Sequence, residues 1–362
     1  MKILLGNVNA PLAYECDLTS AATDHPARRT HWEVLSPECE SFVSCGICAI
    51  PGCVDRYTPD ILLFLMDWVC TDEHKRRYEM LPGVLTYARE RGVCLVTNTS
   101  DLPHTWMTAH SVGIIRFMET LKYFDAILAS HDCMLRSLPL VTDVPVHVWN
   151  VASEVCLRMS SQTYPTQVRD HICVTDPCLS SRGQLRGGFS NHVIARELIR
   201  LHPEYRLWVL FDGGLGEHPQ TLQEVDPLIE YLGLDSVTDS LSKDWALWDD
   251  YMATLCRSAL LVNMDTWQAR GQTNYEAAAC GVPIVGTAVP QSSEYLGVGV
   301  GVRDPLDFRG AIDVGHRLLS DRGLWLRESH RLFHLAKAIS FDDCWETLTQ
   351  IIVQTRAKRG HG

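Results

Sequence analysis

Short apolar runs alternate with amphipathic stretches along most of the chain. A brief, continuous apolar run is typical of a strand buried on both faces, and its alternation with helices is typical of parallel α/β units. In the first half the expected strands are Lys2–Leu5, Ile61–Leu65, Val93–Thr97, Ala126–Ala129 and Val146–Trp149. In the second half the pattern restarts, and the expected strands are His171–Thr175, Leu207–Phe211, Leu260–Asn263, Pro283–Gly286 and Val298–Val302.

Stretches with helical periodicity separate these strands. Between the two series lies Ser153–Arg169, a polar segment without clear periodicity, which we interpret as the interdomain connection. The pattern predicts two Rossmann-like α/β domains, at residues 1–155 and 171–340, with a linker at 156–170 and a terminal segment at 341–362. The expected helices are Gly83–Arg91, Thr108–Lys122, Asn191–Leu201, Thr221–Leu232, Trp248–Arg257, Thr273–Cys280, Asp307–Leu319 and Phe341–Thr355.

Composition agrees with a two-domain globular protein. A chain of 362 residues exceeds what one hydrophobic core usually covers, and 46% hydrophobic residues exclude a largely disordered chain. The net charge of −12 disfavours tight, non-specific binding to nucleic acid or anionic membranes, although Arg28-Arg29 and Lys75–Arg77 form local basic clusters. The first residues resemble a strand and not a signal peptide, and no apolar run could span a bilayer. We therefore expect a cytoplasmic protein without membrane insertion.

The chain contains 14 cysteines. Cys45 and Cys48, followed by Cys53, have a spacing that suggests zinc, but the second cysteine or histidine pair of a zinc signature is missing from the sequence. Other cysteines, such as Cys94 and Cys173, are flanked by apolar residues, which favours buried free thiols. We predict no metal site, while metal binding by Cys45, Cys48 and Cys53 stays an open alternative.

The segment Asn263–Thr287 carries the most specific chemistry. An expected strand ends at its start, a polar loop with Gly271 follows, and a short helix leads into another strand. Thr273 and Glu276 have the spacing of a capping box, which predicts the helix start. A helix N-terminus after a glycine loop is a natural seat for phosphate. The backbone amides expected at this seat belong to Gln272, Thr273 and Asn274.

This segment resembles the retaining GT-B glycosyltransferases of family four, in which E-x7-E followed by A-x-A-C-G-x-P-V-V holds the nucleotide sugar. The resemblance implies that Glu276 accepts hydrogen bonds from the ribose hydroxyls of the donor; the alternative is that it only closes the capping box. The matching residues are Glu276, Ala277, Ala279, Cys280, Gly281, Pro283, Val285 and Thr287.

The chain departs from the family at Gln268, eight residues before Glu276. The family usually has a glutamate there that contacts the transferred sugar. A neutral amide can hydrogen-bond to sugar hydroxyls, but it cannot stabilise an oxocarbenium-like transition state by charge. Gln268 therefore leaves open which sugar is transferred and, to some extent, whether the chain is catalytic.

A second match follows the expected strand His171–Thr175. The family has an arginine and a lysine, five apart, that clamp the diphosphate; here Arg182 and Arg186 are four apart. Two fixed cations would neutralise the leaving nucleoside diphosphate, as a magnesium ion does in other transferases. The alternative is that both are solvated loop charges.

The resemblance extends more loosely over residues 58–350, through Thr58–Ile61, Tyr123–Ser130 and Ser340–Trp345. It implies a GT-B architecture, with two Rossmann-like domains facing across a cleft and a C-terminal helix that crosses back to the first domain. Loops of the first domain should then hold the acceptor. Asp101 and His104 are candidates for a base, or are ordinary loop residues. The candidate acceptor contacts are Asn98, Arg76 and Arg77.

These features predict a nucleotide-sugar-dependent glycosyltransferase that acts with retention and without metal. No tightly bound cofactor is expected; a nucleotide sugar, UDP-sugar above others, is the co-substrate. The acceptor hydroxyl stays open among small molecules, glycans, proteins and a hydroxymethylated DNA base. The alternatives are a nucleotide-sugar epimerase or phosphorylase of the same fold, and a catalytically silent sugar-nucleotide-binding protein.

Overall fold

The computed structural model divides the chain into two compact units. Unit 1 comprises Met1–Ala152 together with Phe341–Gly362, and unit 2 comprises Ser153–Ser340. Each unit contains one largely parallel sheet with helices on both faces, which confirms the predicted α/β class. The structure describes residues 1–7, 12–13, 15–17, 39–66, 72–99, 111–129, 133–149, 164, 169–175, 188–211, 228–242, 248–266, 271–289, 291–297, 302–338 and 341–359.

The sheet of unit 1 has seven strands in the order β2-β3-β1-β4-β5-β6-β7. Neighbouring strands are parallel, except that β2 is antiparallel to β3. The central strands are uninterrupted apolar runs because helices cover both of their faces. Their bounds are β1 (Lys2–Asn7), β2 (Glu15–Asp17), β3 (Ser41–Cys45), β4 (Ile61–Leu65), β5 (Cys94–Asn98), β6 (Ala126–Ala129) and β7 (Val146–Val148).

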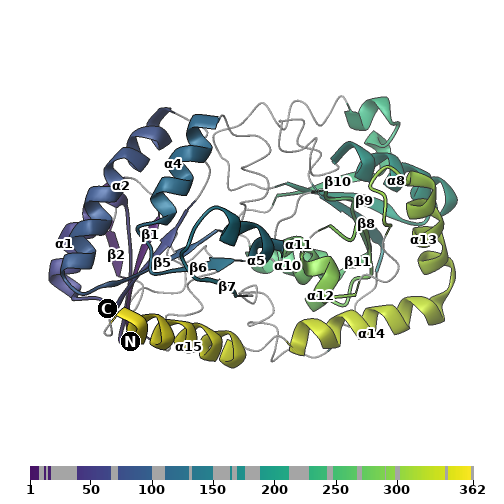
Figure 1. Ribbon diagram of the computed structural model, residues 1–362. Helices are drawn as coiled ribbons and strands as arrows, with labels where there is room; N and C mark the ends of the chain where they lie inside the picture. The colour runs from purple at the N-terminus through teal and green to yellow at the C-terminus, as the bar shows by residue number, and fades with distance from the viewer. Residues whose placement is uncertain are drawn as a thin grey trace. The chain divides into compact units, whose positions relative to one another are not determined.

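Successive side chains of these strands enter two different cores. Leu4 and Leu62 pack in the core beneath α1, α2 and α4, whereas Ile3 and Leu63 pack in the core that includes Leu348 of α15. Figure 1 shows α15 on the opposite side of this sheet from α1, α2 and α4. The helices are α1 (Ile50–Tyr57), α2 (Asp72–Glu90), α4 (Ser111–Leu121), α5 (Cys133–Ser137) and α15 (Phe341–Arg359).

Two aspartates fix strands at the amino edge of this sheet. Asp60, directly before β4, accepts a hydrogen bond from the backbone N–H of Lys2 at 2.9 Å and pairs with Arg356 of α15 at 3.2 Å. Asp125, directly before β6, accepts one from the backbone N–H of Leu95 at 2.8 Å. Both belong to segments of the predicted family resemblance, and both tie a strand to its neighbour.

The sheet of unit 2 has five parallel strands in the order β10-β9-β8-β11-β12. Helices α8 and α13 cover one face and α10, α11 and α14 the other (Figure 1). The strands are β8 (His171–Thr175), β9 (Arg206–Phe211), β10 (Thr238–Ser242), β11 (Ser258–Asn263) and β12 (Ile284–Gly286). The helices are α8 (Gly188–Leu201), α10 (Trp248–Cys256), α11 (Gln272–Ala279), α12 (Gln291–Tyr295), α13 (Phe308–Ser320) and α14 (Arg322–Ala338).

Two residues of the range predicted as linker pack specifically within unit 2. The ring of Tyr164 stacks on His330 with centroids 4.1 Å apart. The guanidinium of Arg169 donates to the carbonyl oxygens of Ser258 at 3.1 Å and Cys280 at 2.9 Å. These contacts connect the segment that precedes β8 to α14 and to the ends of β11 and α11.

Several elements differ from the sequence prediction. The helix expected from Gly83 starts at Asp72, because Pro82 lies inside α2 and does not begin it. Strands β2, β3 and β10 and helices α1, α5, α12 and α14 were not predicted. Of the expected strand Val298–Val302, the described residue Val302 forms an isolated bridge to Thr287. Of the expected helix Thr221–Leu232, residues 228–231 are helical, and 221–227 lie outside the described residues.

The described cysteines confirm the prediction of free thiols. Nine of them are free, and seven of these are buried, among them Cys94 and Cys173. Cys45 hydrogen-bonds to Cys53, while Cys48 is exposed. Within the described ranges we find no group of three or more side chains placed to hold a metal ion. Nor does any helix in those ranges have the length and hydrophobicity to cross a membrane.

Candidate functional site at the carboxyl edge of unit 2

Helix α11 connects β11 to β12 and is bounded by two glycines. Gly271 precedes the helix with φ 68° and ψ 52°, a left-handed conformation that favours glycine. Gly281 follows it with φ 62°. The N–H of Gly281 donates to Ala278 and that of Val282 to Ala277, both at 2.8 Å, which is the Schellman pattern of helix ends. Both ends of this short helix are therefore set by backbone geometry.

The predicted capping box at Thr273 and Glu276 is wrong. Gly271 occupies the N-cap position, so Thr273 lies inside the first turn, and no side chain caps the helix. The backbone N–H of Asn274 donates to the carbonyl of Gly271 at 3.0 Å, so this amide already has an acceptor. The amides of Gln272 and Thr273 lie at the start of the helix, where amides lack an intrahelical acceptor.

A chain of neutral side chains crosses the carboxyl edge of the sheet at this point. On α8, Asn191 accepts from the backbone N–H of Met264 and donates to the hydroxyl of Thr175, both at 2.7 Å. Thr175 donates to Asn263 at 3.2 Å, and Asn263 donates to the side-chain oxygen of Asn274 at 2.8 Å. We call Thr175, Asn191, Asn263 and Asn274 the amide relay.

The relay ends at α12. The side-chain amide of Asn274 donates to the hydroxyls of Ser292 at 3.1 Å and Ser293 at 3.2 Å. Asn274 and Ser292 are completely buried, and Asn263 is 4% exposed. One connected set of hydrogen bonds therefore joins α8, β8, β11, α11 and α12.

The loop after β11 is held in a similar way. The hydroxyl of Thr287, just past β12, donates to the backbone carbonyl of Asp265, and it accepts from the N–H of Val289 at 3.4 Å. Thr287 belongs to the segment that resembles the glycosyltransferase family. In this fold it ties the end of β12 to the loop that leads towards α11.

Glu276 lies on α11 with its side chain fully buried. Its charge acts on Cys280, one turn further along: burial and the contact with Cys256 raise the pKa of the Cys280 thiol, and the Glu276 carboxylate adds to this. A carboxylate in such surroundings is stable only with polar partners or neighbouring charge, so the position is chemically distinctive.

The remaining predicted residues fall in different parts of the chain. Asn98 is the last residue of β5 in unit 1, buried to 4% exposure, and its carbonyl accepts from Met66 at 3.3 Å. Arg76 and Arg77 lie on α2, and their side chains are not described. The predicted site residues outside the described residues are Asp101, His104, Arg182, Arg186 and Gln268.

Sequence reasoning missed the members of the relay other than Asn274. The available signal was a polar residue directly at the end of an apolar run: Thr175 ends β8 and Asn263 ends β11. Asn191 was expected to begin its helix, but α8 starts at Gly188 and Asn191 lies in the first turn. Ser292 and Ser293 belong to α12, which was not predicted.

The opposite, amino edge of the same sheet is held by charge. Asp170 lies 2.5 Å from the ring nitrogen Nδ1 of His171, and Arg257 donates to it at 2.7 Å. Burial alone would raise the pKa of Asp170, but the hydrogen bonds from His171 and Arg257 outweigh it and leave the pKa below its ordinary value. The ring of His171 stacks on Trp208 with centroids 3.5 Å apart.

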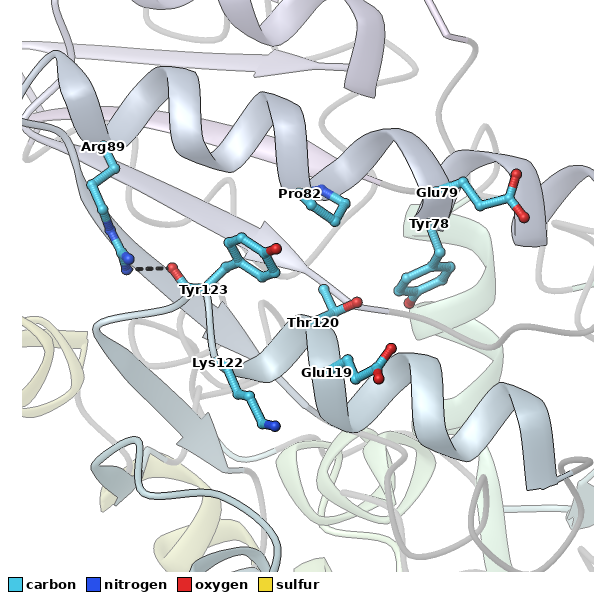
Figure 2. Close-up of a pocket in the computed structure, with 8 residues that line it drawn as sticks. All are labelled: Tyr78, Glu79, Pro82, Arg89, Glu119, Thr120, Lys122 and Tyr123. Atoms are coloured by element: carbon cyan, nitrogen blue, oxygen red, sulfur yellow. Dashed lines mark hydrogen bonds between the residues drawn. The ribbon is translucent and has the colours of Figure 1, made fainter.

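Unit 1 contains a separate hollow of about 500 Å³ between α2 and α4. Figure 2 shows Tyr78 and Pro82 of α2 on one side of it and Thr120 and Tyr123, from α4 and the turn that follows, on the other. At one end, Arg89 donates to the carbonyl of Tyr123 at 2.6 Å and pairs with Asp125 at 3.1 Å. None of the predicted site residues lines this hollow.

Comparisons with known proteins give the fold. No model of a protein family matches the sequence, and no curated protein sequence matches it. Solved structures do match. Sucrose-phosphate synthase from Thermosynechococcus elongatus aligns with 99% of this chain and 100% of its own, at 12% identity and a TM-score of 0.68. HepE from Anabaena, in complex with UDP, aligns with 98% and 100%, at 12% identity and a TM-score of 0.69.

A trehalose-6-phosphate synthase, studied for glycosyltransfer with retention, also matches, over 84% of this chain and 76% of its own, at 12% identity and a TM-score of 0.62. At such low identity these similarities show the fold. The whole chain has the GT-B glycosyltransferase fold with two Rossmann-like domains, as the sequence predicted.

Proposed function

We propose that this chain is a glycosyltransferase that moves a sugar from a UDP-sugar to an acceptor hydroxyl. The observation that carries the proposal is the glycine-bounded helix α11 after β11, with a buried glutamate at Glu276, in a chain of GT-B fold. The neighbouring HepE structure contains UDP, which supports this nucleotide. Ligands of open α/β sheets bind outside the carboxyl ends of the strands, where α11 begins.

Each part of the donor is assigned to residues of unit 2. Glu276 accepts hydrogen bonds from the ribose hydroxyls, and the amides of Gln272 and Thr273 face the phosphates at the positive end of α11. Gln268 binds hydroxyls of the transferred sugar. Arg182 and Arg186 neutralise the charge that develops on the leaving diphosphate.

In the transfer, the anomeric carbon loses its bond to the phosphate oxygen and gains one to the acceptor oxygen. The acceptor hydroxyl gives up its proton to a base, for which Asp101 and His104 are the candidates in unit 1. We propose that the configuration is retained; the similarity to a synthase that transfers with retention supports this. Acceptor contacts are proposed for Asn98, Arg76 and Arg77.

The acceptor class is tested directly with labelled donor. Small sugars, glycans, proteins and hydroxymethylated DNA are offered in parallel, with unmodified DNA as the control for the last. Equal labelling of unmodified and hydroxymethylated DNA would remove the DNA base as acceptor. Phosphate contacts from Arg28, Arg29 and Lys75–Arg77 would make DNA binding salt-dependent, with a log–log slope of roughly 2–4.

Donor binding is tested by titrating nucleoside diphosphates and their sugars into the full chain by calorimetry. Glu276→Gln keeps the volume of the buried side chain and should weaken UDP binding by about 1–3 kcal/mol through loss of charge-assisted hydrogen bonds. Glu328→Gln on α14, a glutamate that pairs with Arg331, is the matched control. UDP binding by Glu276→Gln as tight as that of the parent would refute the ribose role.

Catalysis is tested separately from binding. Arg182→Ala and Arg186→Ala should lower kcat as well as raise KM, because their charge matters most as the diphosphate leaves. One feature, Gln268, favours a second candidate, a catalytically silent sugar-nucleotide-binding protein. UDP-sugar binding without transfer or hydrolysis of the donor would support the silent binder, and an exchanged sugar without acceptor would indicate an epimerase.

A further inference from the structure

The amide relay connects the two helix layers of unit 2 around the end of its sheet. Asn191 belongs to α8, which packs in the core on one face, and Asn274 belongs to α11, whose residues pack in the core on the other face. Thr175 and Asn263, the last residues of the adjacent strands β8 and β11, complete the connection. The first turns of two helices are thereby fixed to the same two strand ends.

Each side-chain amide in the relay both donates and accepts. Asn191 donates to Thr175 and accepts from Met264, and Asn274 donates to the serines of α12 and accepts from Asn263. Such a connected, buried network holds its members in one arrangement, because breaking one bond leaves a buried polar group without a partner.

The relay is also electrically neutral. Carboxylates or ammonium groups would bind the same partners more strongly, but a negative charge in the first turn of α11 would repel an anionic ligand, and a positive one would be costly to bury. Amides and hydroxyls fix the helix while leaving the partial positive charge of its N-terminus available.

We propose that Asn274 and Asn263 are positioning residues of the donor site. This inference rests on the proposed function. The side chain of Asn274 does not bind the nucleotide itself. It holds the first turn of α11, with the amides of Gln272 and Thr273, at the distance from β8 and α8 that the diphosphate requires. Ser292 and Ser293 then link α12 to the same position.

The test compares UDP affinity with stability in five variants of the full chain. Asn274→Ala and Asn263→Ala should each raise the Kd for UDP and the KM for the donor on the order of tenfold, because small displacements of binding groups cost much affinity. Ser329→Ala is the matched control: it removes a buried hydroxyl that donates to the carbonyl of Gly281 at the other end of the same helix. It should lower the melting temperature and leave both constants unchanged.

Comparing Kd and KM with the apparent kcat separates a positioning role from a loss of stability. A variant that only unfolds more readily loses apparent kcat, while Kd and KM of its folded fraction stay those of the parent. The double variant Asn263→Ala/Asn274→Ala should bind UDP within about threefold of the weaker single variant, because both changes break one connection. Effects that multiply would show two independent contributions and overturn the relay.

Thr175→Val gives a milder version of the same test, since it removes only the hydroxyl between Asn191 and Asn263 and suits a strand. It should raise the Kd for UDP several-fold even if the alanine variants fail to fold. If folded relay variants bind UDP with the Kd of the parent, or if Ser329→Ala loses as much UDP affinity as they do, the inference is overturned and the proposed function is not. Failure of the parent to bind any nucleoside diphosphate or its sugar overturns the proposed function and the inference together.

Discussion

The two edges of the sheet in unit 2 are held by different chemistry. At the amino edge, Asp170, Arg257 and the half-buried guanidinium of Arg169 connect strands through charge. At the carboxyl edge, Asn263 and Asn274 connect the same strands to their helices through neutral amides. Both edges require polar groups, because strand ends leave backbone and side-chain groups that must find partners.

The difference indicates what each edge is for. Charged pairs tolerate partial exposure to water, and the side chain of Asp170 is 37% exposed. Their fields would disturb an anionic ligand bound close by, whereas amide dipoles impose no net charge. Charged pairs thus hold the amino edge, where stability alone is needed, and the neutral relay holds the first turn of α11 at the edge where we place the donor.

The largest effect is expected from Gly286→Ala. A Cβ at this position would lie 2.5 Å from the backbone carbonyl oxygen of Asn263, so β11 and β12 would have to separate at the carboxyl edge. We expect a loss of about 3 kcal/mol in the free energy of unfolding, measured with urea. Gly83→Ala in α2, where the added Cβ meets nothing within 4 Å, is the matched control and should be neutral or stabilising.

Arg169→Leu tests the amino edge. Its guanidinium donates to two backbone carbonyls, and burial lowers its pKa, so the contact is both desolvated and charged. We expect a loss of about 2 kcal/mol in the free energy of unfolding with an unchanged Kd for UDP. A clear loss of UDP affinity at full folding would show that the two edges are not separate in function.

Asp170→Asn tests the same edge through pH. Because the pKa of Asp170 is lowered from its ordinary 3.8, its contribution to stability is present above that value and disappears as the pH falls through the lowered pKa. The variant should be less stable than the parent at pH 7, by under about 1 kcal/mol, and the two should converge in acid. Urea unfolding from pH 7 down to pH 2 measures this; a difference that grows in acid would contradict it.

The smallest effect concerns salt. Raising the ionic strength towards 1 M shortens the Debye length to about 3 Å, so the stability difference between the parent and Asp170→Asn should shrink by a few tenths of a kcal/mol. The difference between the parent and Thr175→Val should stay constant, since neutral hydrogen bonds are not screened. If both stability differences changed equally with salt, the distinction between a charged amino edge and a neutral carboxyl edge would be wrong.

The sequence predicted the central strands well because their neighbours bury both faces. Ile61–Leu65, Ala126–Ala129 and His171–Thr175 have the bounds that their apolar runs indicate. The unpredicted strands β2 and β10 lie at the edges of their sheets, and β3 pairs with β2. The edge strand Thr238–Ser242 consists mostly of polar residues, so an apolar pattern does not reveal it.

The site was predictable only where it is local. The glycines that bound α11 lie in the predicted segment, but the left-handed Gly271 displaces Thr273 from the cap position, which spacing alone does not indicate. The relay joins Asn191 to Met264 across 73 residues, so its pairing depends on the tertiary fold. Polar residues at strand ends suggest that partners exist; they do not say which.

The helix α15 has a consequence for the order in which the protein is made. Its Leu348, Ile351 and Ile352 complete a core of unit 1, and the ring N–H of Trp149 donates to the carbonyl of Cys344 at 2.9 Å. During synthesis the ribosome finishes residues 153–340 before it reaches this helix. Until then the core that includes Ile3 and Leu63 lacks these three side chains, and incompletely packed nascent domains are prone to engage chaperones or aggregate. Unit 1, most of which is translated first, is therefore completed only after unit 2 has been synthesised.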